Sequence, residues 1–432
     1  MNQDNVKILG IAGSLRSGCI DSPVEDLPDT RNGLMRFLKN HSNGRCANSE
    51  LALLAALWGA RQEGASISAV SLSKFFRSSR AGDRKTVIAS LIKDADGLFV
   101  SSPVYFGANS CLVQDFIESL NGDAAVRSLL PGKLYSGLAV GAKRNGGQET
   151  TLIYQMAEML NLGFLGVGNN TSTTCQYGGT VVAGNKSAMV EDELGIETCV
   201  GAGSRIAQAA RIFAAGKSRS DDSGAHVDFW ILQDRHRQAE ALIQPLREFL
   251  GMNHLRSTCF RIYDYLLQPC KACDRCPDGK NSYGVYQCRI DSRGDEFNVL
   301  HDSLVQSDVI VPTLFSPVDR THLSSVYQRF LERTRYLRRG GYVLSNRVVI
   351  PLIFCEIGRN DHLDLRLMSS LIRHNTILHK PLIGMTSKGR LINAEEIMKD
   401  WKTAITISAR LVAGRYHLEK HLLRPRYIPI GY

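Results

Sequence analysis

The sequence predicts an α/β protein made of two tandem doubly wound domains, each built on a five-stranded parallel sheet. The first observation is length, because 432 residues exceed one ordinary hydrophobic core and favour two domains of about 200 residues. The second is that short apolar runs alternate with helix-like segments, as in parallel sheets with crossover helices. The third is that the same order recurs in the second half. We place the first domain at 1–216, a polar linker at 217–226 and the second domain at 227–432.

Composition indicates a globular protein without a membrane span. Apolar residues make up 44% of the chain and charged residues 22%, as in ordinary soluble domains, and no run of about 18 apolar residues occurs. The polar amino terminus lacks a secretory pattern, so we expect a cytoplasmic protein whose eleven cysteines are thiols or metal ligands rather than disulfides.

The net charge says less about possible binding partners. The net charge is +10, which is compatible with a nucleic acid or an acidic protein partner. The basic run at 329–339 (RFLERTRYLRR) could likewise dock an acidic redox partner. A solvated basic surface explains both observations, and we do not expect nucleic-acid binding.

The elements of the first half follow one another as strand, loop and helix. Each predicted strand is a short apolar run bounded by glycine or polar residues. Predicted strands cover 6–12, 65–72, 95–100, 135–140 and a segment near 164–167, with helices after 49, at 84–92, after 150 and at 203–216.

The loop after the first strand has the composition of a phosphate site. Residues 13–18 read Gly-Ser-Leu-Arg-Ser-Gly. Backbone amides in a glycine turn and the start of the next helix can bind an anion. Neither the GxxxxGK[ST] nor the GxGxxG pattern is present.

An insertion separates this loop from its helix. Residues 18–47 are polar and interrupted by proline and glycine, and the periodic helix starts only after Asn48 and Ser49. These two residues either complete the phosphate loop across the insertion or only cap the helix. The sequence leaves both interpretations open, and the role of the insertion with them.

Two further loops follow the third and fourth strands. Residues 101–107 (SSPVYFG) form a proline-stiffened turn with an aromatic tip, and residues 141–150 (GAKRNGGQET) are rich in glycine and polar groups. Ligands bind at the carboxyl ends of parallel strands, where these loops meet the first one. The segment 168–185 has too much Gly, Thr and Asn for regular structure and could cover the site.

The second half repeats the pattern with different loops. Predicted strands cover 227–233, 258–265, 307–316, 347–354 and 381–385, with helices to 250, near 364–374 and at 394–412. The loop after its first strand, 234–239 (DRHRQA), lacks glycine and hydroxyls, so a bound phosphate is not expected there.

Four cysteines after the second of these strands have the spacing of a metal centre. Cys270, Cys273 and Cys276 are three residues apart, and Cys288 follows after eleven more. Zinc sites more often use two separated CxxC pairs, whereas a compact CxxCxxC with a remote fourth cysteine favours a [4Fe–4S] cluster. Zinc or unligated thiols remain as alternatives.

The motifs GSLRS at 13–17, SSPVYFG at 101–107 and RNGGQET at 144–150 resemble those of the NADPH-dependent FMN reductase and iron–sulfur flavoprotein group of flavodoxin-like proteins. The resemblance covers most of residues 5–215. It implies that each predicted domain is flavodoxin-like, and that the first binds FMN. By resemblance, the phosphate would be held by Ser14, Arg16, Ser17, Asn48 and Ser49, and the ring would be lined by Pro103, Val104, Tyr105, Phe106, Gly107, Asn145, Gly146, Gly147 and Gln148.

The two halves divide the family's features between them. Iron–sulfur flavoproteins carry their cysteines just after the second strand, where the first half has none in 73–82 and the second half has its four. We interpret the chain as a fused pseudo-dimer with a degenerate second domain, which keeps one FMN site and one cluster site. Two such chains could still pair as a homodimer.

These features predict an oxidoreductase that passes electrons between FMN and the [4Fe–4S] cluster, with NAD(P)H as one source of hydride and a small molecule or a protein as acceptor. One alternative is an electron-transfer module that serves a partner enzyme. A second is an NAD(P)H:quinone or flavin reductase with a structural metal site. A third is a zinc protein with a vestigial flavin fold.

Overall fold

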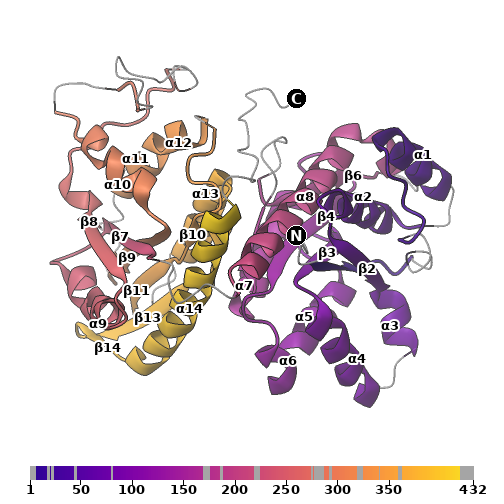
Figure 1. The fold of residues 1–432 in the computed structure, drawn as a ribbon, viewed down its shortest axis with the longest axis horizontal. Helices are drawn as coiled ribbons and strands as arrows, with labels where there is room; N and C mark the ends of the chain where they lie inside the picture. Colours follow the sequence, from indigo (N-terminus) through magenta and orange to yellow (C-terminus); the bar gives the residue numbers. More distant parts are fainter. Residues whose placement is uncertain are drawn as a thin grey trace. The chain divides into compact units, whose positions relative to one another are not determined.

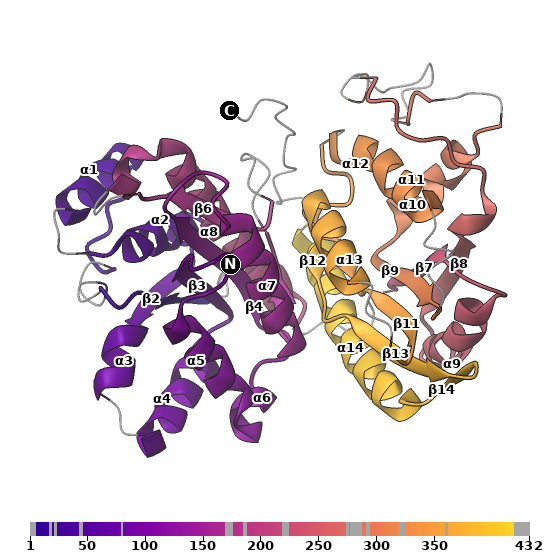
Figure 2. The same cartoon turned by 180° about the vertical axis from the view of Figure 1, so that it is seen from behind.

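The computed structural model describes residues 6–16, 20, 24–42, 46–78, 81–168, 176–184, 188–217, 224–273, 276, 287–290, 294–318, 325–339, 341–358 and 362–418. The chain divides into two compact units, the first ending at Ala214 and the second beginning at Ala215. Figures 1 and 2 show each unit as a sheet between helices.

The sheet of the first unit is parallel. Its strands follow the order β2-β1-β3-β4, and β4 then pairs with β5 near its start and with β6 near its end. Order 2-1-3-4-5 is that of a doubly wound flavodoxin-like sheet. The strands are β1 (Lys7–Ala12), β2 (Ser66–Ser71), β3 (Gly97–Pro103), β4 (Leu134–Gly141), β5 (Leu165–Gly166) and β6 (Gly178–Val182).

Helices cover both faces of this sheet. Helices α2 and α8 pack on one face so closely that a methyl group on Gly203 would lie 1.8 Å from the Ala56 carbonyl oxygen. On the opposite face, α5 and α7 are joined by Gln114 and Glu158, whose side chains lie 3.4 Å apart. The helices are α1 (Arg31–Ser42), α2 (Asn48–Gln62), α3 (Leu72–Ser78), α4 (Ala81–Asp94), α5 (Cys111–Asn121), α6 (Ala124–Ser128), α7 (Gln148–Asn161) and α8 (Glu193–Ala215).

The second unit has the same strand order. Strand β8 pairs with β7, β7 with β9, and β9 with both β10 and β11, which pair in turn with β12 and β13. Only β14, among the described strands, is antiparallel to its neighbour β13. The strands are β7 (His226–Gln233), β8 (Arg256–Arg261), β9 (Val309–Ser316), β10 (Val348–Val349), β11 (Leu352–Glu356), β12 (Ile377–Leu378), β13 (Leu382–Ser387) and β14 (Arg390–Leu391).

Adjacent aromatic residues of β7 define the two faces of this second sheet. Phe229 packs 5.6 Å from the Trp401 ring of α14, whereas Trp230 packs 5.5 Å from the Phe330 ring of α11. The Trp401 indole also donates to the Leu246 carbonyl of α9, so α9 and α14 share a face. The helices are α9 (Gln238–Met252), α10 (His301–Gln306), α11 (Ser325–Arg333), α12 (Arg335–Arg339), α13 (Leu363–Leu371) and α14 (Ala394–Leu418).

The structure confirms the α/β class and the parallel strand order, and it corrects three expectations. Residues 178–182, expected to be irregular, form β6, because their backbone continues the ladder beside β4. Part of the insertion forms the helix α1. Cys46 is disulfide-bonded rather than a thiol. Within the described residues, no helix has the length and apolar character needed to span a lipid bilayer.

Candidate functional site

The loop after β1 is fixed against the end of β3 and the start of α5. The Gly13 amide donates to the Ser101 carbonyl at 2.8 Å, and the Ser110 hydroxyl donates to the Gly13 carbonyl at 2.7 Å. The Ser14 hydroxyl is buried and accepts the Arg16 amide at 3.2 Å. Ser17, also predicted at this site, lies outside the described residues.

The start of α2 lies at the same edge of the sheet, although thirty residues of insertion separate it from the loop. The Ser101 hydroxyl donates to the Ser49 carbonyl at 2.7 Å, so one serine of β3 contacts both the loop after β1 and the first turn of α2. The predicted phosphate residues Ser14 and Ser49 are therefore brought to one place by the fold.

The first turn of α2 is not capped as the sequence suggested. Helix α2 begins at Asn48, its N-cap is Ala47, and the Glu50 carboxylate accepts the Ala47 amide at 3.0 Å. Of the two interpretations left open for Asn48 and Ser49, the helix cap is wrong, because Ala47 is the N-cap and both residues lie inside the helix. The Ser49 hydroxyl oxygen is buried and has no hydrogen-bond partner in the described part of the chain.

A buried hydroxyl without a partner is costly. Its position in the first turn of a helix, where free amides and the helix dipole favour an anion, gives it the surroundings of a phosphate ligand.

The turn after β3 presents aromatic side chains to solvent. Tyr105 and Ala108 exchange backbone hydrogen bonds of 3.1 and 2.9 Å, and Phe106 and Gly107 between them have positive φ. Positive φ at both central residues is characteristic of a type I′ turn. Tyr105 is 58% exposed and Phe106 fully exposed, so the turn offers apolar ring surface beside the sheet edge.

The loop after β4 approaches this turn closely. A methyl group on Gly147, whose φ is +101°, would lie 3.0 Å from the Gly107 Cα and 3.3 Å from the Val104 side chain. The exposed Asn145 and Gly146 lie on the same loop. The structure thus brings the two predicted ring-binding segments together, and only glycine fits the contact between them.

Gln148 holds this loop in place rather than facing outward. Its side chain is buried, its Oε1 accepts the Gly146 amide at 2.9 Å, and its Nε2 donates to the Lys143 carbonyl at 2.8 Å. Because both ends of the amide are engaged, Gln148 is a positioning residue.

The corresponding loop of the second unit is closed by its own carboxylate. Asp234 accepts the amides of Arg235 at 2.7 Å, of Ala239 at 2.8 Å and of Glu240 at 3.3 Å. Ala239 and Glu240 belong to the first turn of α9, where a phosphate would otherwise bind. An acidic side chain therefore occupies the anion position of this unit.

The four predicted metal ligands form no disulfide bond. Cys288 is buried, Cys270 and Cys276 are half-buried, and Cys273 is exposed. Burial raises the pKa of the Cys276 thiol, the Arg339 guanidinium opposes this, and the charges of Cys288, Cys273 and Cys270 raise it further. The other three cysteines are thus near enough to act on Cys276. Among the described residues, however, no three Cys, His, Asp or Glu side chains are near enough to share a metal ion.

A buried ion pair supports this cysteine segment. Arg333 and Asp295 form a two-pronged pair, with Nη1–Oδ1 at 2.7 Å and Nη2–Oδ2 at 2.8 Å. Arg333 also donates to the carbonyls of Gln268 and Ile290, both at 3.1 Å. It therefore ties together the segments that carry Cys270 and Cys288.

Sequence reasoning missed several residues of both sites. Arg333 falls within the basic run 329–339, whose alternation of charge and apolar residues resembles a solvated helix face, yet its side chain is fully buried. Asp234 and Asp295 carry no motif at all. Ser101 and Ser110 could have been found, because they follow a predicted strand at the ligand-binding edge.

Comparison with known proteins places the match in the first unit. The family model described as NADPH-dependent FMN reductase matches residues 38–175. An iron–sulfur flavoprotein of Methanocaldococcus jannaschii is 34% identical over 125 residues, which are 29% of this chain and 64% of that protein. An NAD(P)H dehydrogenase (quinone) of Nitrobacter winogradskyi is 31% identical over 136 residues, 29% of this chain and 67% of that protein. The chain therefore spans slightly less than two thirds of the iron–sulfur flavoprotein.

Solved structures match about half of the chain. A flavone reductase aligns with a TM-score of 0.32 and 18% identity, covering 48% of this chain and 63% of that one. A WrbA-like flavodoxin of Agrobacterium tumefaciens aligns with a TM-score of 0.30 and 16% identity, covering 48% of this chain and 98% of that one.

Proposed function

The chain belongs to the NADPH-dependent FMN reductase family of flavodoxin-like proteins, and from this premise we propose that it is a flavin-dependent oxidoreductase with divided cofactor sites. The first unit would hold FMN, and the four cysteines of the second would hold a [4Fe–4S] cluster. One observation carries the FMN site: the buried Ser49 hydroxyl, without a partner in the described residues, lies where two ligand-binding loops meet.

The phosphate of FMN would bind between the loop after β1 and the first turn of α2. Ser14, Arg16 and Ser17 would contact it from the loop, and Asn48 and Ser49 from the helix. The Arg16 guanidinium supplies charge, and the helix N-terminus supplies amides. Ser101 positions both segments through its bonds to Gly13 and Ser49.

The flavin ring would lie between the two loops that meet at Gly107 and Gly147. The turn after β3 would contribute aromatic faces and backbone amides, and the loop after β4 a close glycine backbone. The exposed side chains of Tyr105 and Phe106 would exclude water from one face of the flavin ring. The residues are Pro103, Val104, Tyr105, Phe106 and Gly107 on one side and Asn145, Gly146 and Gly147 on the other, with Gln148 as the positioning residue.

The cysteine segment has the donors that an iron–sulfur cluster needs. Cys270, Cys273, Cys276 and Cys288 form no disulfide bond, and burial raises the pKa of Cys276 although the Arg339 charge opposes that rise. Coordination to iron would itself favour the deprotonated thiolate form of these cysteines. The iron–sulfur flavoprotein of M. jannaschii supports the choice of metal.

When bound, FMN exchanges two electrons or one, and the cluster exchanges one at a time. NAD(P)H would serve as hydride donor, and a small molecule or a protein would accept the electrons. The match to an NAD(P)H dehydrogenase (quinone) favours quinone or free flavin reduction as the second candidate activity, with the cysteines holding a structural metal.

Two observations support the fused pseudo-dimer. Both units use the strand order 2-1-3-4-5, and each would hold only one of the two proposed cofactors. The second unit's anion position is filled by Asp234, whereas residues 73–82, directly after the second strand of the first unit, contain no cysteine. We infer that duplication was followed by loss of one cofactor site from each copy.

Replacing Ser49 by alanine is expected to weaken FMN binding by at least about tenfold, because a hydrogen bond to a charged group contributes about 1.5–3 kcal/mol. Stability without FMN should not fall, because the hydroxyl removed is buried without a partner. The measurement is FMN affinity by fluorescence quenching. Ser136→Ala, which removes a buried hydroxyl 3.3 Å from the Gly168 carbonyl, is the matched control and should bind FMN normally. Equal affinities for the two variants would contradict the phosphate site.

Replacing Cys276 by serine is expected to lower the iron content severalfold while leaving FMN bound. Loss of one of four thiolates weakens the cluster, and no FMN residue lies in the second unit. Iron and flavin are quantified in anaerobically purified protein, with Cys259→Ser as the control thiol. If the variant keeps its iron, the assigned ligand set is wrong. Retained reductase activity with little iron would instead favour the structural-metal alternative.

A further inference from the structure

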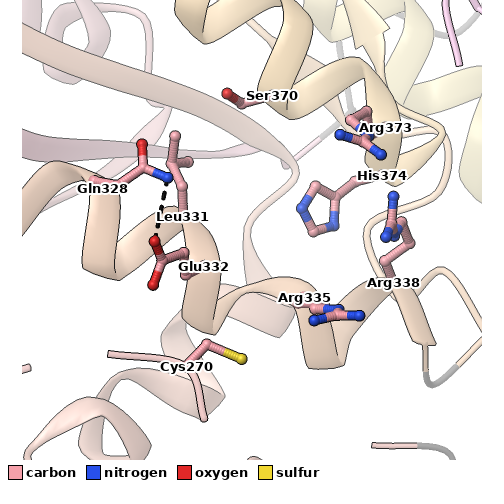
Figure 3. Close-up of a pocket in the computed structure, with 9 residues that line it drawn as sticks. All are labelled: Cys270, Gln328, Leu331, Glu332, Arg335, Arg338, Ser370, Arg373 and His374. Carbon is pink, nitrogen blue, oxygen red and sulfur yellow. Dashed lines mark hydrogen bonds between the residues drawn. The ribbon is translucent and has the colours of Figure 1, made fainter. Parts of the chain in front are cut away.

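A cavity of about 550 Å³ opens in the second unit beside the cysteine segment. Helices α11 and α12 form one wall, and the end of α13 with the short 3-10 turn Ile372–His374 forms the other. Figure 3 shows three arginines gathered around His374, with Glu332 and Cys270 across the cavity. Its volume is typical of small-molecule sites.

The charges in this cavity are unbalanced. Arg335, Arg338 and Arg373 line it, and neither Arg335 nor Arg373 forms an ion pair or a hydrogen bond with any described residue. Glu332 is the one acidic residue among its lining residues, and its carboxylate accepts the Gln328 amide at 3.4 Å. Arg335 and Arg373 thus present two guanidinium groups without a counter-charge in the described part of the chain, and two such groups match the oxygens of a dianion.

His374 adds a buried acceptor. Burial lowers the pKa of its ring to about 3, and the charges of Arg338 and Arg373 act in the same direction, so the ring is neutral. The Thr334 hydroxyl donates to the Leu331 carbonyl and must therefore accept from His374 Nε2, which lies 3.3 Å away. This assigns the proton to Nε2 and a lone pair to Nδ1. Nδ1 is buried without a partner in the described residues.

We propose that this cavity binds a small phosphate monoester that also carries hydroxyl groups, such as a sugar phosphate. Guanidinium forks match phosphate oxygens geometrically, and a phosphate monoester carries nearly two negative charges at neutral pH. The lone pair of His374 Nδ1 then accepts a ligand hydroxyl. None of the cavity residues is assigned to FMN, and Cys270 is the one lining residue that is also a proposed cluster ligand.

The test is isothermal titration calorimetry on the full chain with glucose 6-phosphate, orthophosphate, sulfate and citrate as probes. We expect saturable binding at one site per chain for glucose 6-phosphate, with weaker binding of orthophosphate, which lacks the hydroxyls. Arg335→Gln and Arg373→Gln should each weaken glucose 6-phosphate binding by at least about tenfold. His374→Phe should reduce the preference for glucose 6-phosphate over orthophosphate.

Arg366→Gln is the matched control. Arg366 lies on α13, close to the cavity in sequence, but its guanidinium lies 5.1 Å from the centroid of the Tyr327 ring and does not line the cavity. Its substitution should leave glucose 6-phosphate affinity unchanged. No saturable binding, equal loss in all three arginine variants, or tighter binding of citrate than of glucose 6-phosphate would each overturn the proposal. FMN and iron contents report on the cofactor proposals independently.

Discussion

Replacement of Arg333 by methionine is expected to destabilise the second unit by about 3–5 kcal/mol. The pair is inaccessible to solvent, with side-chain exposures of 0% for Arg333 and 1% for Asp295. Removing the guanidinium leaves a buried carboxylate without its counter-charge and frees the segments around Gln268 and Ile290. Urea unfolding in a Trp58→Phe background measures this unit alone, because the two remaining tryptophans, Trp230 and Trp401, both lie in it.

Lys380→Met is the control for this experiment. Lys380 and Asp400 form an ion pair at 2.7 Å, but both side chains are about 30% exposed, so the loss should be under about 1 kcal/mol. A comparable decrease in the free energy of unfolding of both variants would contradict the role given to Arg333.

The Arg333 pair also makes a prediction about pH. Burial alone would raise the pKa of Asp295, but the hydrogen bonds from Arg333 and Gln268 outweigh it and lower that pKa. A lowered pKa in the folded state stabilises the protein above the ordinary Asp value of about 3.9, and this contribution is lost as pH falls through the lowered value. The stability difference between wild type and Asp295→Asn should therefore shrink below about pH 4.

Replacement of Gly13 by alanine is expected to lower FMN affinity by at least about tenfold and stability by about 1–3 kcal/mol. The new methyl group would lie 2.1 Å from Val113 Cγ2 and 3.0 Å from the Ser101 carbonyl oxygen. The loop must then move away from β3, and Ser14 would move with it. FMN content after purification and affinity of the refilled protein measure the effect.

Gly251→Ala is the matched control, because no atom lies within 4 Å of the added methyl group. Gly251 lies in α9, where alanine should be neutral or stabilising by up to about 1 kcal/mol. FMN loss in this control as well, or normal FMN binding by Gly13→Ala, would show that the loop after β1 does not hold the cofactor.

Much of the fold was predictable because each strand is a short apolar run with a distinct end. The runs at 6–12, 95–100 and 135–140 correspond to β1, β3 and β4 within a few residues. The positions of the ligand-binding loops follow from that order, since parallel strands end at one edge. The sequence also allowed the prediction that Ser49 lies beside the loop after β1, although the insertion separates them.

Other features depend on contacts that no local pattern records. Strand β6 has a Gly-rich sequence and forms because the backbone at the end of β4 has hydrogen-bonding groups with which it can pair. Asp234 resembles any loop carboxylate until its three amide bonds are seen. Arg333 lies within a charged run, and only its partner Asp295, 38 residues away, shows that it is buried. Tertiary pairing of this kind leaves no periodicity in the sequence.

The most direct test of divided cofactor sites is an absorption spectrum of anaerobically purified full-length protein, with iron, sulfide and flavin quantified. We predict flavin bands with a broad shoulder near ~400 nm, and about four iron atoms and one FMN per chain. Two FMN per chain would contradict the assignment of Asp234 to the second unit's anion position. Zinc without iron or flavin would contradict the redox function altogether.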